Sequence, residues 1–155
     1  MAVLRAITNL PMQPFRDAME KMGFTDVESY GMSGNLLFDA PTSDARALEC
    51  RIAERFGTDA FVRTRTEMAG VVARDPLGEI VMFLARPPTA AKRRAFEDLD
   101  VEDPRPVLRG RTLFFSYPLL LRGRRTPLDI EDALGVRGTF RTSRVVRTLL
   151  ARMSG

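Results

Sequence analysis

The stretch Tyr30–Phe38, which reads YGMSGNLLF, places residues that could bind an anion at a turn between two apolar segments. Gly34 can adopt a positive φ, and the side chains of Ser33 and Asn35 can hydrogen-bond to neighbouring backbone groups. Those properties predict a tight turn. Backbone N–H groups exposed at such a turn can also form a concave nest for an anion. The sequence leaves open whether the block is a turn alone or a turn that holds an anion.

Two arginines and a tyrosine could complete an anion site at this turn. Arg5 lies on the first expected strand, Arg141 lies shortly before the last expected helix, and Tyr30 opens the block. Guanidinium groups bind carboxylates and phosphates through paired hydrogen bonds, and a tyrosine hydroxyl adds one more donor. The candidate ligand-binding set is therefore Arg5, Tyr30, Ser33, Gly34, Asn35 and Arg141.

The composition excludes several kinds of catalytic and metal site. The chain has no histidine and a single cysteine, Cys50. A Ser–His or Cys–His nucleophile pair therefore cannot form within one chain, and a zinc or iron–sulfur site would have too few ligands. An enzyme built on this chain would have to use carboxylates, tyrosine, lysine or a bound cofactor. We predict no catalytic set, no metal site and no cofactor, and the sequence favours a non-enzymatic protein.

Length and composition indicate a small globular protein of the cytoplasm. The 155 residues fit one domain or two small units, and the 45% hydrophobic and 28% charged content is ordinary. No apolar run approaches the roughly 20 residues that a membrane-spanning helix needs. The N-terminal residues lack a basic segment followed by a long apolar one, which predicts no signal peptide. A single cysteine also fits a reducing compartment, so we expect a cytoplasmic protein with no membrane partner.

Basic residues gather toward the C-terminus. Residues 105–155 contain eleven arginines against three acidic residues, in a chain of net charge +4. Phe114, Phe115 and Tyr117 lie among these arginines, and aromatic residues in a basic groove can bind single-stranded nucleic acid. In a strand, however, Leu113, Phe115 and Tyr117 would share one core-facing side, and the arginines would form a solvated rim. Nucleic-acid binding is therefore possible but not favoured.

Hydrophobic periodicity and turn residues predict strands and helices in a repeating order. The first half is expected to contain a strand at 2–7, a helix at 14–22, strands at 27–30 and 35–38, a helix capped by Ser43 or Asp44 and ended by Gly57, and a strand at 60–64. After a helix at 66–73 and a break at 75–78, we expect a strand at 79–84, a helix at 88–99, a hairpin at 106–117 and helices at 126–135 and 143–153.

Strand, helix, strand, strand, helix, strand is the order of a split βαβ, or ferredoxin-like, unit. The first half of the chain predicts that order in full, and the second half resembles it in outline. We therefore expect an α+β fold of two ferredoxin-like units, with helices packed on antiparallel or mixed sheets. The expected units are an N-terminal one at 1–75 and a C-terminal one at 76–155.

Several blocks of the chain, taken in order, resemble the bacterial family called domain of unknown function 1697. The most specific is a Tyr-x-x-Ser-Gly-Asn-x-x-Phe hairpin, which reads YGMSGNLLF here and follows a Gly-Phe pair. The stretches LRAI, VMFLARPP, LFFSYP and LGVRGTFRTSRVVRTLL are similar to the other blocks, so the resemblance covers nearly the whole chain. It implies a small α+β protein of ferredoxin-like units, with no established activity.

The chain departs from that family at two places. The family usually follows its first strand with a glycine-bearing loop, where this chain has Ala6–Pro11. The family's terminal block tends to read Thr-x-Arg-Asn-Trp, whereas Thr139–Ser143 contains neither Asn nor Trp. If those family residues serve a ligand, this chain has an altered site.

Three functions stay open on the sequence. The favoured one is a non-enzymatic binding or protein-interaction module of unknown ligand. The second is an enzyme or sensor that binds a small anionic metabolite near Arg5 and Ser33–Asn35. The third is weak nucleic-acid binding through the arginine-rich C-terminal half. The sequence does not give the oligomeric state.

Overall fold

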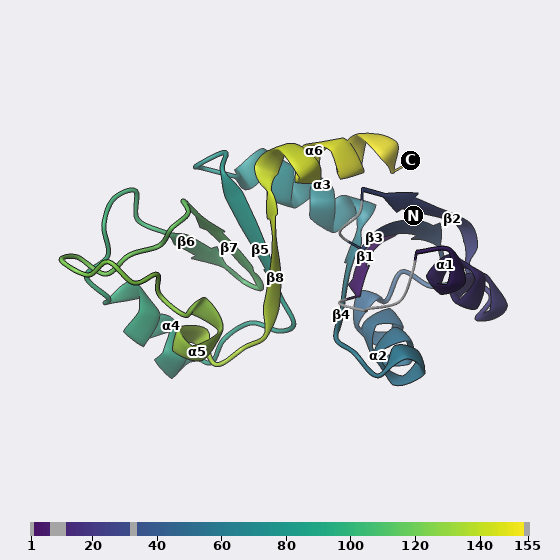
Figure 1. The fold of residues 1–155 in the computed structure, drawn as a ribbon, viewed down its shortest axis with the longest axis horizontal. Coiled ribbons are helices and arrows are strands. Elements are labelled where there is room, and N and C mark those ends of the chain that lie inside the picture. The colour runs from purple at the N-terminus through teal and green to yellow at the C-terminus, as the bar shows by residue number, and fades with distance from the viewer. Residues whose placement is uncertain (1, 7–11, 32–33, 154–155) are drawn as a thin grey trace. The chain divides into compact units, whose positions relative to one another are not determined.

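The computed structural model describes residues 2–6, 12–31 and 34–153 of the chain. Among these residues are six helices and two four-stranded antiparallel sheets, which confirms the expected mixed α+β class. The chain divides into two compact units, residues 1–70 with 147–155, and residues 71–146. Each unit contains one sheet (Figure 1). No helix in the described part of the chain is both long and apolar enough to cross a membrane.

The first unit packs two helices on one face of its sheet (Figure 1). In spatial order its strands are β2 (Thr25–Tyr30), β3 (Asn35–Asp39), β1 (Ala2–Ala6) and β4 (Ala60–Thr64). The helices are α1 (Met12–Lys21), which follows β1, and α2 (Ala45–Phe56), which joins β3 to β4. The core between helices and sheet includes Phe15, Met19, Leu36, Phe38, Leu48, Ile52 and Val62.

The bounds of α2 follow the capping residues that the sequence predicts. The Asp44 side chain accepts a hydrogen bond from the N–H of Ala47 at 3.1 Å, so Asp44 rather than Ser43 begins the helix. Gly57 ends it with a φ of +64°, and its N–H donates to the carbonyl of Ala53 at 2.8 Å.

The second unit repeats the order of elements of the first. In spatial order its strands are β6 (Val107–Arg109), β7 (Thr112–Phe115), β5 (Ile80–Leu84) and β8 (Gly138–Thr142). The helices are α4 (Ala90–Glu97), which follows β5, and α5 (Ile130–Leu134), which joins β7 to β8. The core includes Met82, Leu84, Phe96, Leu113, Phe115 and Leu134. After the last strand of each unit comes one more helix, α3 (Arg65–Arg74) after β4 and α6 (Ser143–Arg152) after β8.

The region that leads into β8 differs from the prediction. The sequence predicts a helix over 126–135 and no strand before Ser143, whereas α5 has only five residues and β8 follows it. Pro127 lies in an isolated β-bridge with Leu120, which keeps this segment extended, and the cap that begins α5 is Asp129. The expected helix therefore begins later than predicted, although Gly135 ends it as predicted, and the strand β8 after it was not expected.

The strand β7 is also shorter than predicted. Phe114 and Phe115 are buried, but Tyr117 is 65% exposed because the strand ends at Phe115. Pro118 follows and has no N–H for a ladder bond. The expectation that Tyr117 shares the core face of this strand was therefore wrong.

Replacing Gly70 with alanine should stabilise the protein. Gly70 lies within α3, and a Cβ built on it meets no atom within 4 Å. Because glycine inside a helix costs about 0.5–1 kcal/mol relative to alanine, Gly70→Ala should raise the free energy of unfolding by that amount, measured by urea denaturation. Gly57→Ala is the matched control, since Gly57 has equal space but a φ of +64° that strains alanine. A gain in both variants, or in neither, would contradict this expectation.

Candidate functional site

The Ser-Gly-Asn block lies at the connection between β2 and β3. Gly34 has a φ of +75°, and Tyr30 pairs with Asn35 across the two strands. Asn35 is buried, and its Nδ2 donates to the carbonyl of Tyr30 at 3.2 Å. Asn35 therefore stabilises the connection between the two strands, and this structural role explains its presence without any bound ligand.

Three members of the predicted anion site lie together in the first unit, namely Tyr30, Gly34 and Asn35. Ser33 and the side chain of Arg5 lie outside the described residues, although the backbone of Arg5 pairs with Asn35. Arg141 belongs to β8 in the second unit. An anion site formed by these six residues stays a prediction.

An arginine that the sequence analysis missed lies against the first of these residues. The guanidinium of Arg152, from α6, lies 5.0 Å from the centroid of the Tyr30 ring. The same guanidinium pairs with the carboxylate of Glu28 on β2. Sequence position gives no hint of this contact, because α6 is far from β2 along the chain. The ion pair partly neutralises the cation, which weakens the case for a strong anion site at this turn.

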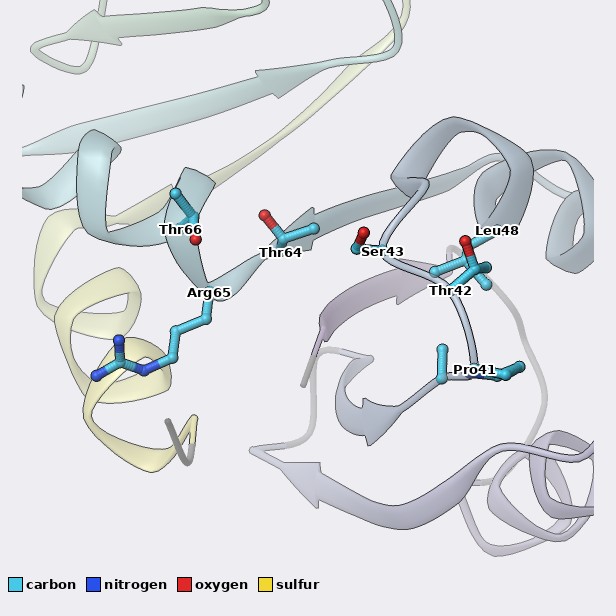
Figure 2. A pocket seen from close by; sticks show the side chains of 8 residues that line it. Pro41, Thr42, Ser43, Leu48, Thr64, Arg65 and Thr66 are labelled. Carbon is cyan, nitrogen blue, oxygen red and sulfur yellow. The ribbon is translucent and has the colours of Figure 1, made fainter.

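A cavity of about 290 Å³ lies in the first unit where α2 and α3 begin. Figure 2 shows hydroxyl side chains from both segments around it, including Thr42, Ser43 and Thr64. The one cation in its lining, Arg65, extends away from Ser43 and Thr64 in this view. Arg65 Nε donates to the carbonyl of Met153 at 3.1 Å.

Side-chain oxygens already cap the helix starts that line this cavity. Thr64 Oγ1 accepts from the N–H of Glu67 at 3.2 Å, while Glu67 Oε2 accepts from the N–H of Thr64 at 2.8 Å. This reciprocal pair is a capping box. Asp44 caps α2 in the same region with a second carboxylate. Because negative groups already occupy both helix starts, the cavity is poorly suited to an anion.

Many arginines of the second unit bind its own loops. Those that donate to carbonyl oxygens include Arg86 to Gly135, Arg93 to Leu108, Arg105 to Glu97 and Leu99, Arg109 to Arg74, and Arg122 to Val101. Arg122 Nε donates a hydrogen bond to the Asp100 carboxylate, and this bond, together with the negative charge of that carboxylate, raises the pKa of Arg122 above its ordinary value. These arginines thus have a structural role in holding backbone segments of the second unit together, which does not require nucleic acid. In the described chain no three Cys, Asp or Glu side chains are placed to hold a metal ion.

The outer edge of β4 is closed by two buried, charged side chains. Val62 donates its N–H to Glu49 Oε1 at 2.9 Å. Arg63 Nη1 donates to the carbonyl of Val62 at 2.9 Å and to Glu49 Oε1 at 3.2 Å. An open strand edge would offer these backbone groups to another chain. Here the N–H and the carbonyl of Val62 both have hydrogen-bond partners within the same chain.

The strand β8 occupies the corresponding place in the second sheet. Arg137 and Ser143, which flank β8, hydrogen-bond toward β5. Because antiparallel strands alternate the direction of their backbone groups, Gly138, Phe140 and Thr142 direct theirs to the outer edge. No other strand of the described chain pairs with that edge.

The outer edge of β8 is closed only in part. Glu131 Oε1 accepts from the N–H of Gly138 at 2.7 Å, and Arg141 Nη1 donates to the carbonyl of Phe140 at 2.7 Å. No described residue accepts the N–H of Phe140. Its side chain is 50% exposed and packs edge-on against Phe115, with the ring centroids 6.3 Å apart. The edge therefore presents a free backbone donor beside a half-exposed aromatic ring.

The lengths of α2 and α5 explain the difference between the two edges. Val62 in β4 is fully buried in a core that includes Leu48 and Ile52 of the twelve-residue α2. Phe140 lies opposite Met82, on the core side of its sheet, but the five-residue α5 leaves it half exposed. The sequence alone predicts neither β8 nor an exposed Phe140. The similarity of AFVRT and GTFRT, each followed directly by a helix, is the signal that could have found them.

Comparisons with known proteins agree with this fold and give no activity. Residues 1–114 match the family described as "Protein of unknown function (DUF1697)". The structure resembles that of the conserved bacterial protein SP0830 from Streptococcus pneumoniae, with a TM-score of 0.63 and 18% sequence identity. That likeness covers 97% of this chain and 96% of the other, and at this identity it shows the fold alone. No curated protein matches the chain.

Proposed function

The chain belongs to the DUF1697 family of proteins of unknown function, and on that premise we propose that it is a non-enzymatic protein-interaction module. Its binding surface is the outer edge of β8, where an extended segment of another polypeptide adds a strand to the second sheet. The observation that carries the proposal is the exposed Phe140 ring beside the free Phe140 N–H. The same chain closes the equivalent edge of β4 with Glu49 and Arg63.

Strand addition requires an exposed strand edge with unpaired backbone groups. The backbone of the added segment supplies hydrogen bonds, and side-chain contacts on alternate residues supply specificity. Proteins usually blunt exposed edges with charged side chains, bulges or covering elements, because an open edge recruits other chains. Aromatic residues also contribute a large share of binding energy at interfaces. A free donor and an aromatic ring at one edge position therefore support a binding role for Phe140.

We also propose a ferredoxin-like, split βαβ arrangement for each unit and a reducing, cytoplasmic location for the protein. The support for this arrangement is the shared order of elements and the matching strand orders, β2-β3-β1-β4 and β6-β7-β5-β8. The single Cys50 supports a reducing, cytoplasmic location, and the lack of histidine supports a role without catalysis.

The proposal can be tested with a display library of short, unstructured peptides panned against the purified protein. Selected peptides should lose at least about tenfold in affinity when Phe140→Pro removes both the ring and the N–H. Proline is tolerated on an edge strand whose N–H faces solvent, so the fold should survive. Affinity can be measured by fluorescence anisotropy of labelled peptides.

Tyr117→Ala is the matched control, because it removes another exposed aromatic side chain that lies outside β8. This variant should bind the selected peptides as tightly as the wild type does. Selection of peptides that ignore Phe140, or of no peptide by a protein that is monomeric at the panning concentration, would contradict the proposed binding surface.

A further inference from the structure

We infer that the segment that pairs with β8 is the β8 strand of a second copy of this chain. This inference rests on the proposed function, since it names the occupant of the same edge. Two copies related by a two-fold axis place their β8 strands antiparallel, with Phe140 directly opposite Phe140 of the second copy. The result is a symmetric dimer in which the two second sheets continue into one another.

The backbone of β8 is self-complementary at this position. Phe140 directs both its N–H and its carbonyl to the outer edge. Residues directly opposite one another in an antiparallel pair can exchange both hydrogen bonds. The carbonyl already accepts from Arg141, but a carbonyl oxygen has two lone pairs and can accept again. Two-fold pairing would thus satisfy the free N–H of Phe140 in both copies at once.

The side chains on this edge also match themselves. Directly opposite residues in such a pair have Cα atoms about 5.5 Å apart, so each Phe140 ring would cover the exposed half of the other. The Phe115 ring already lies edge-on behind Phe140. In the same register, Arg141 lies opposite Thr139 of the second copy. The pairing therefore does not set the two Arg141 residues directly against each other.

Charge at the two ends of β8 favours the antiparallel arrangement. At the Gly138 end, α5 begins with Glu131 and Asp132, which are both exposed. Beyond the Thr142 end, α6 begins and carries the exposed Arg144. The two-fold axis places Gly138 of one copy opposite Thr142 of the other. The acidic start of α5 then faces the basic start of α6, where a helix N-terminus also favours negative charge.

Sedimentation equilibrium tests the dimer on the intact chain. The average mass of the wild type should rise with concentration from 17.4 kDa toward twice that value. Phe140→Lys should stay at the mass of one chain, because it places a charge where two rings would meet. Tyr117→Lys makes the same change at an exposed aromatic outside β8 and should behave as the wild type does.

Cysteine cross-linking tests the register in a Cys50→Ser background, since Cys50 is exposed. Phe140→Cys should form an intermolecular disulfide on mild oxidation of a concentrated sample, because about 5.5 Å between Cα atoms suits that bond. Thr142→Cys is the control on the same face of the strand. In the proposed register its symmetry mate is four residues away along the strand, about 13 Å, which is too far for a disulfide.

The results separate this inference from the proposed function. A wild type that stays monomeric, or a Thr142→Cys variant that cross-links better than Phe140→Cys, would overturn the dimer. If the monomeric protein still binds display peptides through Phe140, the edge remains a binding surface with a different occupant and only the dimer is overturned. A dimer that Phe140→Lys abolishes and that cross-links at residue 140 supports the inference, whatever the peptides do.

Discussion

Replacing Glu49 with alanine should lower the free energy of unfolding by about 3–5 kcal/mol, the usual cost of removing one partner from a buried ion pair. Glu49 and Arg63 are both buried, and Nη1 of the arginine lies 3.2 Å from Oε1 of the glutamate. The substitution leaves the guanidinium buried beside a small apolar side chain. It also removes the acceptor of the Val62 N–H and so opens the edge of β4. Urea denaturation of the two proteins measures the loss.

Arg46→Ala is the control for this substitution. Arg46 also approaches Glu49, at 3.9 Å, but its side chain is 58% exposed. Exposed ion pairs contribute about 0–1 kcal/mol, so this variant should lose far less stability than Glu49→Ala. Equal losses in the two variants would show that burial of the Arg63 pair does not decide the stability of this edge.

Gly138→Val should lower the free energy of unfolding by about 3 kcal/mol, the upper end of the usual cost of overpacking a core. A Cβ built on Gly138 lies 2.6 Å from Met82 Cε, 3.0 Å from Leu84 Cδ2 and 3.0 Å from the carbonyl oxygen of Phe83. The Met82 side chain can move aside, but the Phe83 carbonyl belongs to the ladder of β5. Valine adds two further carbons to this crowded position, and urea denaturation again measures the effect.

Thr25→Val provides the comparison for Gly138→Val. Thr25 lies in a strand, β2, and is exposed, and surface substitutions of this kind usually change stability by less than about 0.5 kcal/mol. If valine at residue 138 were tolerated as well as valine at residue 25, the close approach of β8 to β5 would be wrong.

The sequence predicted the first unit better than the second because its signals are local. AFVRT carries three apolar residues in a row, and β4 has the predicted bounds of Ala60–Thr64. GTFRT has the same strand-to-helix position but a single large apolar residue, which produces no clear period. Its pairing depends on β5, which is distant in the chain. A strand specified by a distant partner leaves little trace in its own sequence.

The open edge of β8 at Phe140 could not be predicted from the sequence, because it results from contacts between residues that are distant in the chain. The exposure of Phe140 results from the short α5, and the sequence overestimated that helix because Thr126-Pro127 resembles a helix start. The structure places Pro127 in a bridge with Leu120 instead. The closure of β4 by Glu49 likewise requires a helix and a strand to meet at one edge. The turn at Gly34, by contrast, follows from glycine chemistry alone.

Amide hydrogen exchange at Val62 and Phe140, followed by NMR over a range of protein concentrations, compares the closed edge of β4 with the open edge of β8 in one experiment. The N–H of Val62 donates to Glu49 and should be protected at every concentration. The N–H of Phe140 should exchange rapidly in dilute solution and become protected as the concentration rises and the second copy binds. A Phe140 amide as protected as that of Val62 in dilute solution would show that the edge of β8 is already closed within one chain. A Phe140 amide that stays unprotected at the highest concentration would show that no second copy binds at this edge.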